Sequence, residues 1–201
     1  MFEYENRTYE DVDFGAQDLR DGELTNCTFI KCRFSFGSLE EMLTQNCRFT
    51  ECDFRGAGLN GSIHRETAFE NCNFAEANLF AAKFDSCKMT GSDFAGAKLD
   101  GFTVVRGDWS YTNLRHARLD RQDLRGARFY EADLSECSLQ KADLRGADLT
   151  RCQLAKSKLA GADLRDAVLD GIDFKALDVK NVRMDREQAV LFMRSYGAKV
   201  D

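Results

Sequence analysis

Apolar residues recur at every fifth position along almost the whole chain. From Tyr4 to Met184, 35 of the 37 positions of the form 5n+4 are apolar, and the exceptions are Thr44 and His64. An α-helix needs apolar residues every three to four positions and a strand needs them every second, so a period of five fits neither. The repeat therefore describes a larger unit, continued without insertion through one domain.

The two positions before each apolar site also follow a rule. Small residues dominate the position two before it, at Cys27, Cys32, Ala57, Cys72, Ala77, Ala82, Ala97, Ala117, Ala127, Ala132, Ala142, Ala147, Ala162 and Ala167. Asp or Asn often stands directly before it, at Asp13, Asp18, Asp53, Asn73, Asn78, Asp93, Asn113, Asp123, Asp133, Asp143, Asp148, Asp163 and Asp173. The consensus is A-(D/N)-L-x-x.

A second period of 20 shows how these pentapeptides are arranged. Taken every 20 residues, one column of the large site is leucine from Leu19 to Leu159, and the next is phenylalanine from Phe14 to Phe94. If each pentapeptide forms one side of a square coil, four sides make a 20-residue turn, and each side chain packs on its equivalent one turn away. About nine coils at a strand spacing of about 4.8 Å give a rod roughly 43 Å long.

These motifs resemble those of the pentapeptide-repeat family, and residues 140–169 carry them at near-consensus quality. The resemblance implies an all-β solenoid, a right-handed quadrilateral parallel β-helix. We expect this β-helix over residues 1–184 and a short C-terminal α-helix over 185–201.

Composition is consistent with a stable soluble protein. The 201 residues include no proline and carry a net charge of −6. No apolar run reaches transmembrane length, and the first residues, MFEYENRTYED, are too acidic and polar for a signal peptide. We expect a cytoplasmic location and no membrane association.

The eight cysteines suggest a disulfide or zinc framework until their positions are compared. All of them, Cys27, Cys32, Cys47, Cys52, Cys72, Cys87, Cys137 and Cys152, occupy the small inward site. Free cysteine behaves as a small buried hydrophobe, and no CxxC motif is present. We interpret them as structural thiols, although pairs one coil apart such as Cys32 and Cys52 are close enough for a bridge. We expect no metal and no cofactor.

No catalytic constellation can be assembled, so we do not expect an enzyme. His116 falls on an outward position and Trp109 on a core position. The polar pair Thr44 and His64 admits two interpretations. One is a bulge, in which the chain slips by one residue and the apolar residues just before them turn inward. The other is a displaced corner that contacts a partner.

The surface offers a regular acidic stripe. One 20-residue row, here called the acidic ladder, reads Asp13, Arg33, Asp53, Asn73, Asp93, Asn113, Asp133, Gln153, Asp173. Its aspartates recur every second coil, about 9.6 Å apart, and Glu51 and Glu131 lie on the same side. Such a stripe can imitate the phosphates of duplex DNA for a protein with a positively charged groove. The alternative is that these aspartates only hydrogen-bond the turns and keep the rod soluble.

Charge is distributed unevenly elsewhere. A second row, Asp123, Asp143 and Asp163, is flanked by Arg125, Arg145 and Arg165, which we expect to neutralise it. Residues 1–100 sum to −8 and residues 101–201 to +2.

The repeat stops after Met184, where DREQAVLFMRSYGAKVD predicts a helix. Asp185 is a suitable N-cap with Gln188 as its capping-box partner, and Gly197 is a suitable stop. This helix should cap the open end of the solenoid. Its surplus apolar surface predicts a homodimer interface, made by Ala189, Val190, Phe192, Met193 and Tyr196.

A narrower resemblance comes from SIHRETAFENCNF, SCKMTGSDF and the helix pattern D-x-x-Q-A-V-x-F. These segments are similar to the MfpA and Qnr group of the family, which is linked to fluoroquinolone resistance. The resemblance implies a dimeric DNA mimic that binds DNA gyrase, a type II topoisomerase, and modulates its inhibition by quinolones, with no direct nucleic-acid binding. The partner-binding residues we expect are Asp13, Glu51, Asp53, Asp93, Glu131, Asp133 and Asp173. The alternative function is a structural or scaffolding repeat protein with another partner.

Overall fold

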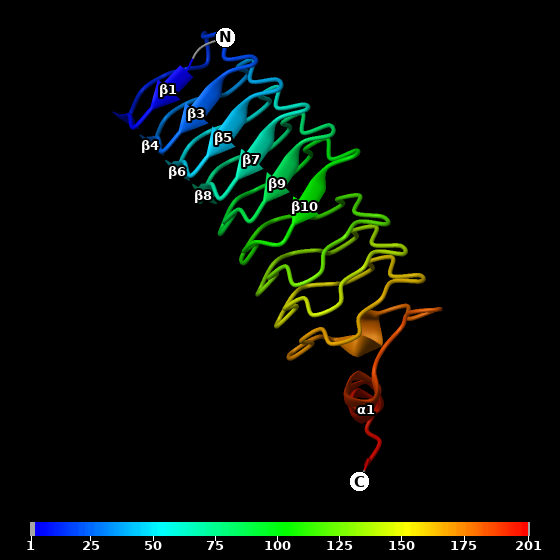
Figure 1. The fold of residues 1–201 in the computed structure, drawn as a ribbon. Helices are drawn as coiled ribbons and strands as arrows, with labels where there is room; N and C mark the ends of the chain where they lie inside the picture. The colour runs from blue at the N-terminus through cyan, green and yellow to red at the C-terminus, as the bar shows by residue number, and fades with distance from the viewer. Residues whose placement is uncertain (1–2, 201) are drawn as a thin grey trace.

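Stacked coils form a rod in the computed structural model, which describes residues 3–200 (Figure 1). The strands are β1 (Glu3–Glu5), β2 (Thr8–Glu10), β3 (Glu23–Thr25), β4 (Thr28–Ile30), β5 (Leu43–Gln45), β6 (Arg48–Thr50), β7 (Ile63–Arg65), β8 (Ala68–Glu70), β9 (Lys83–Asp85) and β10 (Thr103–Val105). They make two parallel sheets, ordered β1-β3-β5-β7-β9-β10 and β2-β4-β6-β8. Each strand pairs with its equivalent 20 residues away, as Tyr4 does with Leu24, so the predicted square-coil register is confirmed.

Regular strands occupy only about five coils, residues 3–105, where about nine coils of β-helix were expected. Beyond Val105 the same 20-residue stacking continues through isolated parallel bridges as far as Asp163 and Arg183. The side-chain chemistry explains the difference. The row that holds Ile63 and Thr103 within strands continues in later coils with Asp123, Asp143 and Asp163, whose side chains fold back onto the backbone and favour turns.

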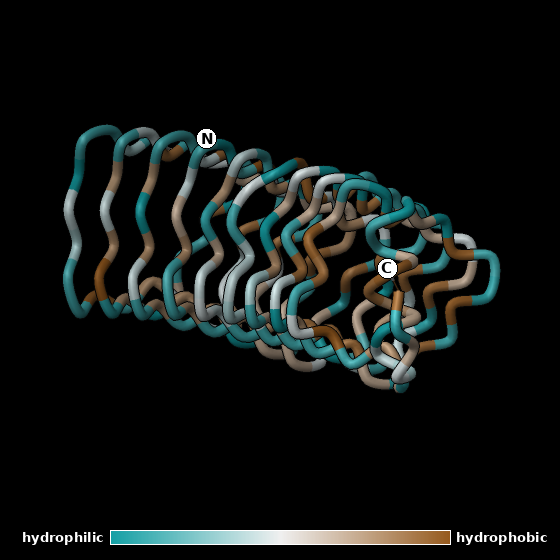
Figure 2. The backbone as a smooth tube through the Cα atoms, turned by 90° about the horizontal axis from the view of Figure 1, so that it is seen from below, coloured by the Kyte–Doolittle hydropathy of each residue, from teal (hydrophilic) through white to brown (hydrophobic). Residues whose placement is uncertain are grey.

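The large sites fill the interior. Every 5n+4 residue from Phe14 to Phe174 is buried, including Trp109, as predicted. The phenylalanine column stacks ring on ring, with centroids 4.9 Å apart for Phe14 and Phe34 and 4.8 Å for Phe34 and Phe54. Each ring therefore repeats at the coil spacing, which confirms the column predicted from the period of 20. Figure 2 shows the coils side by side along the rod, with hydrophilic residues at many of the corners.

The cysteines are free thiols and all eight are buried. Seven of them direct Sγ toward the backbone carbonyl 23 residues earlier, as Cys47 does toward Leu24 at 3.3 Å and Cys72 toward Phe49 at 3.4 Å. Ser92 makes the same bond to Phe69 at 2.9 Å. The thiol thus acts as a small polar group that ties one coil to the next, while burial raises the pKa of Cys87 to about 12 and keeps it protonated.

The bulge expected at Thr44 and His64 is absent, and that interpretation is wrong. Thr44 pairs with His64 in unbroken register, and both side chains point inward and are buried. Their polar atoms satisfy one another, since Thr44 Oγ1 lies 2.9 Å from His64 Nδ1. Ser62 Oγ lies 3.0 Å from His64 Nε2, and Thr67 Oγ1 lies 3.0 Å from Thr44 Oγ1. With both residues buried, this site is not a displaced corner for a partner either.

The corners of the coils share one unusual conformation. Residues at 5n+1 have a positive φ in most coils, which suits glycine, as at Gly91 with a φ of 72°. The sequence nevertheless places side chains there, among them Tyr111 with a φ of 59°. His116, with a φ of 64°, also sits at such a corner, and its side chain is exposed, as predicted.

The C-terminal end is closed by a short 3₁₀ helix, η1 (Phe174–Ala176), and the helix α1 (Arg186–Ser195). The predicted capping box is confirmed, with Asp185 accepting from the Gln188 N–H and Gln188 accepting from the Asp185 N–H. Gln188 is buried and its Nε2 donates to the carbonyls of Leu164 and Ala167. The helix thereby satisfies carbonyls of the last coils. No helix in residues 3–200 is long and apolar enough to cross a membrane.

Candidate partner-binding surface

The acidic ladder is one straight row on the rod. Parallel bridges connect Asp13 to Arg33, Arg33 to Asp53, and so on through each coil to Gln153. Residues 20 apart in the sequence therefore lie next to each other in adjacent coils, as the sequence predicted. Asp173 is the exception, because it caps η1 instead of continuing the bridged row.

Each ladder aspartate uses one carboxylate oxygen to hold its own turn. Oδ1 of Asp53 accepts the N–H of Arg55 at 3.1 Å, and Oδ1 of Asp133 accepts the N–H of Ser135 at 2.9 Å. Oδ1 of Asp93 accepts from Ala95 in the same way. The predicted hydrogen bond from the turn to each aspartate is thus confirmed, and it involves Oδ1. The turn fixes the direction in which the second oxygen is presented.

The ladder charges differ in how far neighbours neutralise them. Asp13 forms an ion pair with Arg33, whose guanidinium lowers the pKa of Asp13. Asp93 accepts a hydrogen bond from Asn113 Nδ2 at 2.8 Å, which adds no charge. The carboxylates of Asp53, Asp93 and Asp133 are half-buried. These three form the bridged part of the ladder whose charge no ion pair within residues 3–200 neutralises.

The two glutamates that we expected beside the ladder lie at coil corners. Glu51 and Glu131 both have a positive φ, of 54° and 52°. Glu51 is exposed, whereas Glu131 forms an ion pair with Arg151 at 3.2 Å. Glu51 therefore adds more free charge than Glu131.

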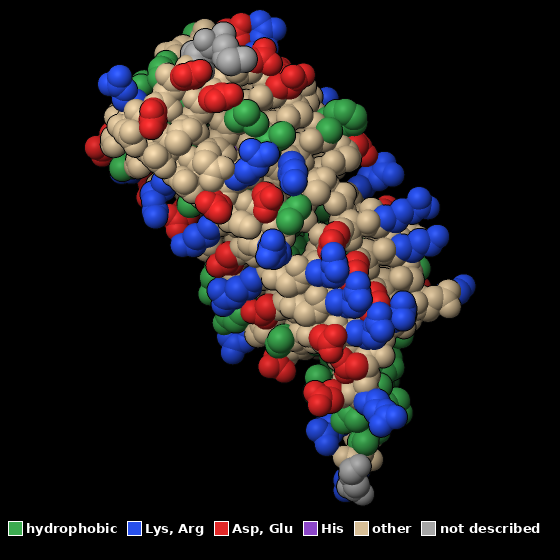
Figure 3. Space-filling model, viewed as in Figure 1, with side chains coloured by type: hydrophobic (Ala, Val, Ile, Leu, Met, Phe, Trp, Pro, Cys, Tyr) green, Lys and Arg blue, Asp and Glu red, His purple; other side chains and the backbone are tan. Residues whose placement is uncertain are grey.

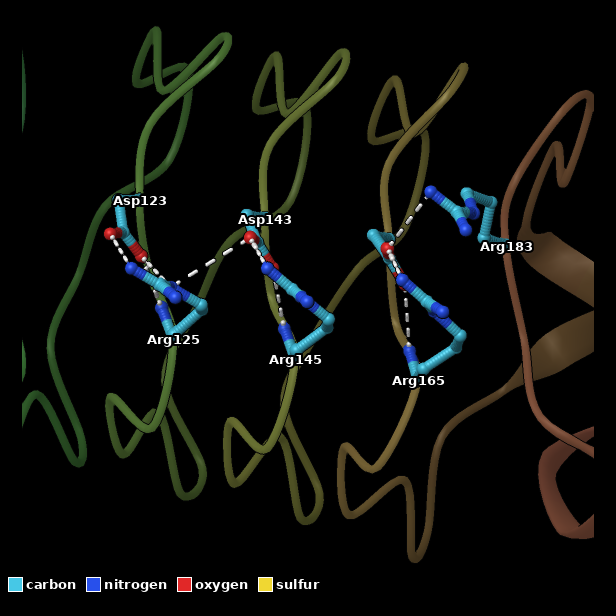
Figure 4. Close-up of polar contacts among 7 residues, drawn as sticks. Asp123, Arg125, Asp143, Arg145, Arg165 and Arg183 are labelled. Carbon is cyan, nitrogen blue, oxygen red and sulfur yellow. Dashed lines mark hydrogen bonds and ion pairs between the residues drawn. The ribbon is translucent and has the colours of Figure 1, made fainter.

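A second charged row, the arginine ladder, lies on the side of the rod that carries β1 and β3, half a coil away from the acidic ladder (Figure 4). It consists of Asp123, Arg125, Asp143, Arg145, Asp163, Arg165 and Arg183. Each aspartate accepts two bonds from the arginine two residues later, at 2.8 and 2.6 Å for Asp143 and Arg145. The predicted neutralisation is confirmed. The Arg165 fork lowers the pKa of Asp163 to about 2.

Charge on this side of the rod also changes sign along its length. Figure 3 shows acidic side chains near the N-terminal end and basic side chains gathered over the C-terminal half. The structure thus follows the charge asymmetry of the sequence.

An aromatic corner went unnoticed in the sequence. Tyr111 and Tyr130 contact each other edge to face, with centroids 5.6 Å apart, and the Arg128 guanidinium lies 5.0 Å from the Tyr130 centroid. Because Tyr111 and Tyr130 are 19 residues apart, no single 20-residue row contains both. A search for aromatic residues on adjacent rows would have found them.

The helix residues expected at a dimer interface divide into two groups. Ala189, Met193 and Tyr196 are exposed. Phe192 and Val190 are half-buried, and Phe192 packs on Phe174 with centroids 5.8 Å apart. Phe192 therefore belongs largely to the cap of its own rod.

The fold and its surface define a class of protein: a parallel β-solenoid whose outward positions carry aligned charged rows. The model of pentapeptide repeats matches residues 65–101, 112–151 and 147–186 in eight copies, and the chain belongs to this family. Comparison with curated proteins gives no significant match.

Solved structures share the whole architecture. Full-length QnrB1, described as a plasmid-mediated fluoroquinolone resistance protein, superposes with a TM-score of 0.87 at 20% identity, over 98% of this chain and 100% of that one. A trypsin-treated variant of QnrB1 gives the same TM-score at 21% identity, over 100% of both chains. At this identity the likeness shows the fold.

Proposed function

We propose that this protein is a DNA mimic that binds DNA gyrase and modulates its activity and its inhibition by quinolone drugs. The single observation that carries the proposal is the straight acidic ladder, in which Asp53, Asp93 and Asp133 present carboxylates of fixed direction. A positively charged groove that accepts duplex DNA is complementary to such a row.

The charge density of the acidic ladder limits how closely it can imitate DNA. Duplex DNA carries one charge per about 1.7 Å of axis, or one per about 3.4 Å of each strand. The ladder carries one carboxylate per about 9.6 Å, by the strand spacing. The row therefore supplies about a third of the charge density of one strand. Electrostatic attraction guides the approach of the partner, and other contacts must supply the rest of the affinity.

The architecture supports the same function. The rod is filled by side chains throughout residues 14–174 and has the fold of QnrB1, a fluoroquinolone resistance protein. We propose that the protein acts in the cytoplasm, as a binding protein without catalytic activity, and that it does not itself bind nucleic acid.

We further propose a homodimer through α1. Leu191, Met193 and Tyr196 are exposed on this helix, and Leu191 borders a groove of about 680 Å³ between α1 and the last coils. Val168, which is 45% exposed, lines the other side of that groove. Two rods joined end to end would span about 90 Å, by the same coil spacing.

A supercoiling assay tests the proposal. Purified gyrase is titrated with the protein, with and without a quinolone, at two salt concentrations. We expect supercoiling or its drug inhibition to change, and the effect to weaken with added salt because exposed charges are screened. No change in either reaction, and no binding to gyrase at low salt, would contradict gyrase as the partner and favour a scaffolding role with another protein.

A further inference from the structure

We infer that the corner formed by Tyr111, Tyr130 and Arg128 is a docking point for an arginine or lysine side chain of the partner protein. The inference rests on the proposed function and deepens it, because the acidic ladder supplies too little charge to account for tight binding by itself. The corner borders the ladder directly, since Tyr111 and Asn113 are two residues apart on the same side of the coil.

Side-chain contacts within this chain already orient the corner. Arg128 lies between Asp108 and Asp148, at 3.5 and 3.2 Å, and its guanidinium supports the Tyr130 ring. Tyr130 in turn contacts Tyr111 edge to face. A fixed aromatic surface loses little side-chain entropy on binding, and tyrosine and arginine are enriched among residues that contribute most to interface affinity.

The fold does not require an aromatic side chain at Tyr111. Its φ of 59° is shared by most corner residues, and the equivalent corners one coil earlier and three coils later hold Gly91 and Gly171, so glycine fits this position as well. Tyr111 is 53% exposed, so the ring contributes little to the core. An exposed aromatic side chain that contributes little to the core favours a role in binding.

The surrounding charge selects a cationic partner group. The corner and the adjacent ladder position contain four carboxylates, from Asp108, Glu131, Asp133 and Asp148, and two guanidinium groups, from Arg128 and Arg151. These groups sum to −2, and Lys88, one coil before Asp108 in the same row, reduces the sum to −1. A guanidinium or ammonium group placed over the Tyr111 ring would gain both cation–π and charge attraction. A groove that accepts duplex DNA would supply such groups, because it must be positively charged.

The experiment measures the Kd for gyrase of the wild type and three variants. Tyr111→Gly removes the ring and places a residue that accepts the positive φ, so the fold should be kept. Tyr111→Phe keeps the aromatic face. Phe80→Ala is the matched control. Phe80 is a comparably exposed aromatic residue, at 56%, but by the period of 20 it lies at the diagonally opposite corner of the rod, away from Tyr111.

We expect Tyr111→Gly to raise the Kd about tenfold or more, as loss of an interface anchor does, while Tyr111→Phe and Phe80→Ala bind like the wild type. Melting temperatures of all variants verify the fold. Equal binding of Tyr111→Gly and wild type would overturn this inference and leave the proposed function standing. Absence of gyrase binding by the wild type would overturn both.

Discussion

At the residue scale, each ladder aspartate can serve the fold and the partner at once. Oδ1 of Asp53, Asp93 and Asp133 accepts a backbone N–H two residues later. Asparagine can make the same bond, as Asn73 does to Ala75 at 3.0 Å. The fold therefore requires an oxygen at this position but not a charge, so replacement by asparagine separates the two roles.

The core column provides a direct test of the fold. Leu119 is buried at a 5n+4 site, and Leu119→Asp places an unpaired charge in the interior. Such burial costs several kcal/mol, so we expect the variant to lose its cooperative melting transition or to melt at a much lower temperature. Circular dichroism on heating measures this. A wild-type melting temperature would contradict the inward assignment.

His64 shows where sequence reasoning failed at this scale. The period placed His64 correctly on a core site, but two polar residues, Thr44 and His64, in an apolar column suggested a slip of the chain. Ser62 and Thr67 occupy the small sites around it, and their hydroxyls pair with His64 and Thr44. These hydroxyl residues were visible in the sequence. Whether their hydroxyl groups point toward His64 and Thr44 depends on side-chain geometry, which a sequence period does not describe.

The pH dependence of stability follows from the same histidine. Burial lowers the pKa of His64 to about 3, below its usual 6.5, so the folded protein holds it neutral. A depressed pKa contributes stability that is complete above pH 6.5 and is lost as pH falls toward 3. We expect the unfolding free energy to decline as pH falls below 6.5, with a slope that approaches roughly 1.4 kcal/mol per pH unit near pH 5.

Denaturant titrations at each pH measure this decline. The variant His116→Gln, which removes the exposed histidine, should retain it, and His64→Phe should abolish it in this range. A flat profile for the wild type between pH 6.5 and 5 would contradict a neutral, buried His64.

At the element scale, the coils fall into two kinds. Strands hold the coils up to Val105, whereas beyond it the arginine ladder spans coils joined by isolated bridges. The sequence predicted the coil register and the charged rows because both follow from spacing. It did not predict where the strands end. That depends on whether a side chain accepts a nearby backbone N–H, as Asp143 does from Arg145.

The arginine forks should contribute little stability individually. In the Asp143 fork the Arg145 side chain is 41% exposed and the Asp143 side chain 29%, so solvent screens part of the attraction. We expect Asp143→Asn to lower the melting temperature by no more than about 2–4 °C at low salt, and by less at high salt. Differential scanning calorimetry measures the shift. A loss that is large and insensitive to salt would contradict a screened surface pair.

The helix α1 links the element scale to the whole molecule, because it caps the rod and is the surface through which we propose that two rods dimerise. Leu191 and Met193 are exposed, whereas Phe192 packs on Phe174. We expect Leu191→Glu with Met193→Glu to convert a dimer to a monomer while the coils stay folded. Light scattering measures the mass, and a monomeric wild type would contradict the proposed dimer.

At the scale of the whole molecule, the rod carries two charged rows on opposite sides. The acidic ladder runs from the first coils to Gln153, and the arginine ladder occupies only the C-terminal half. The sequence predicted both rows from the period of 20. It did not reveal the tyrosine corner, because Tyr111 and Tyr130 meet across adjacent rows and not along one.

The most direct test of the DNA-mimic proposal compares two triple variants that change the net charge equally. One replaces the acidic-ladder residues Asp53, Asp93 and Asp133 by asparagine, and the other does the same to Asp123, Asp143 and Asp163. The Kd for gyrase is measured at one salt concentration, with melting temperatures as a control. We expect the first variant to bind at least about tenfold more weakly than wild type, and the second to bind as tightly as wild type. Equal binding by both variants, whether retained or lost, would contradict the acidic ladder as the surface that imitates DNA.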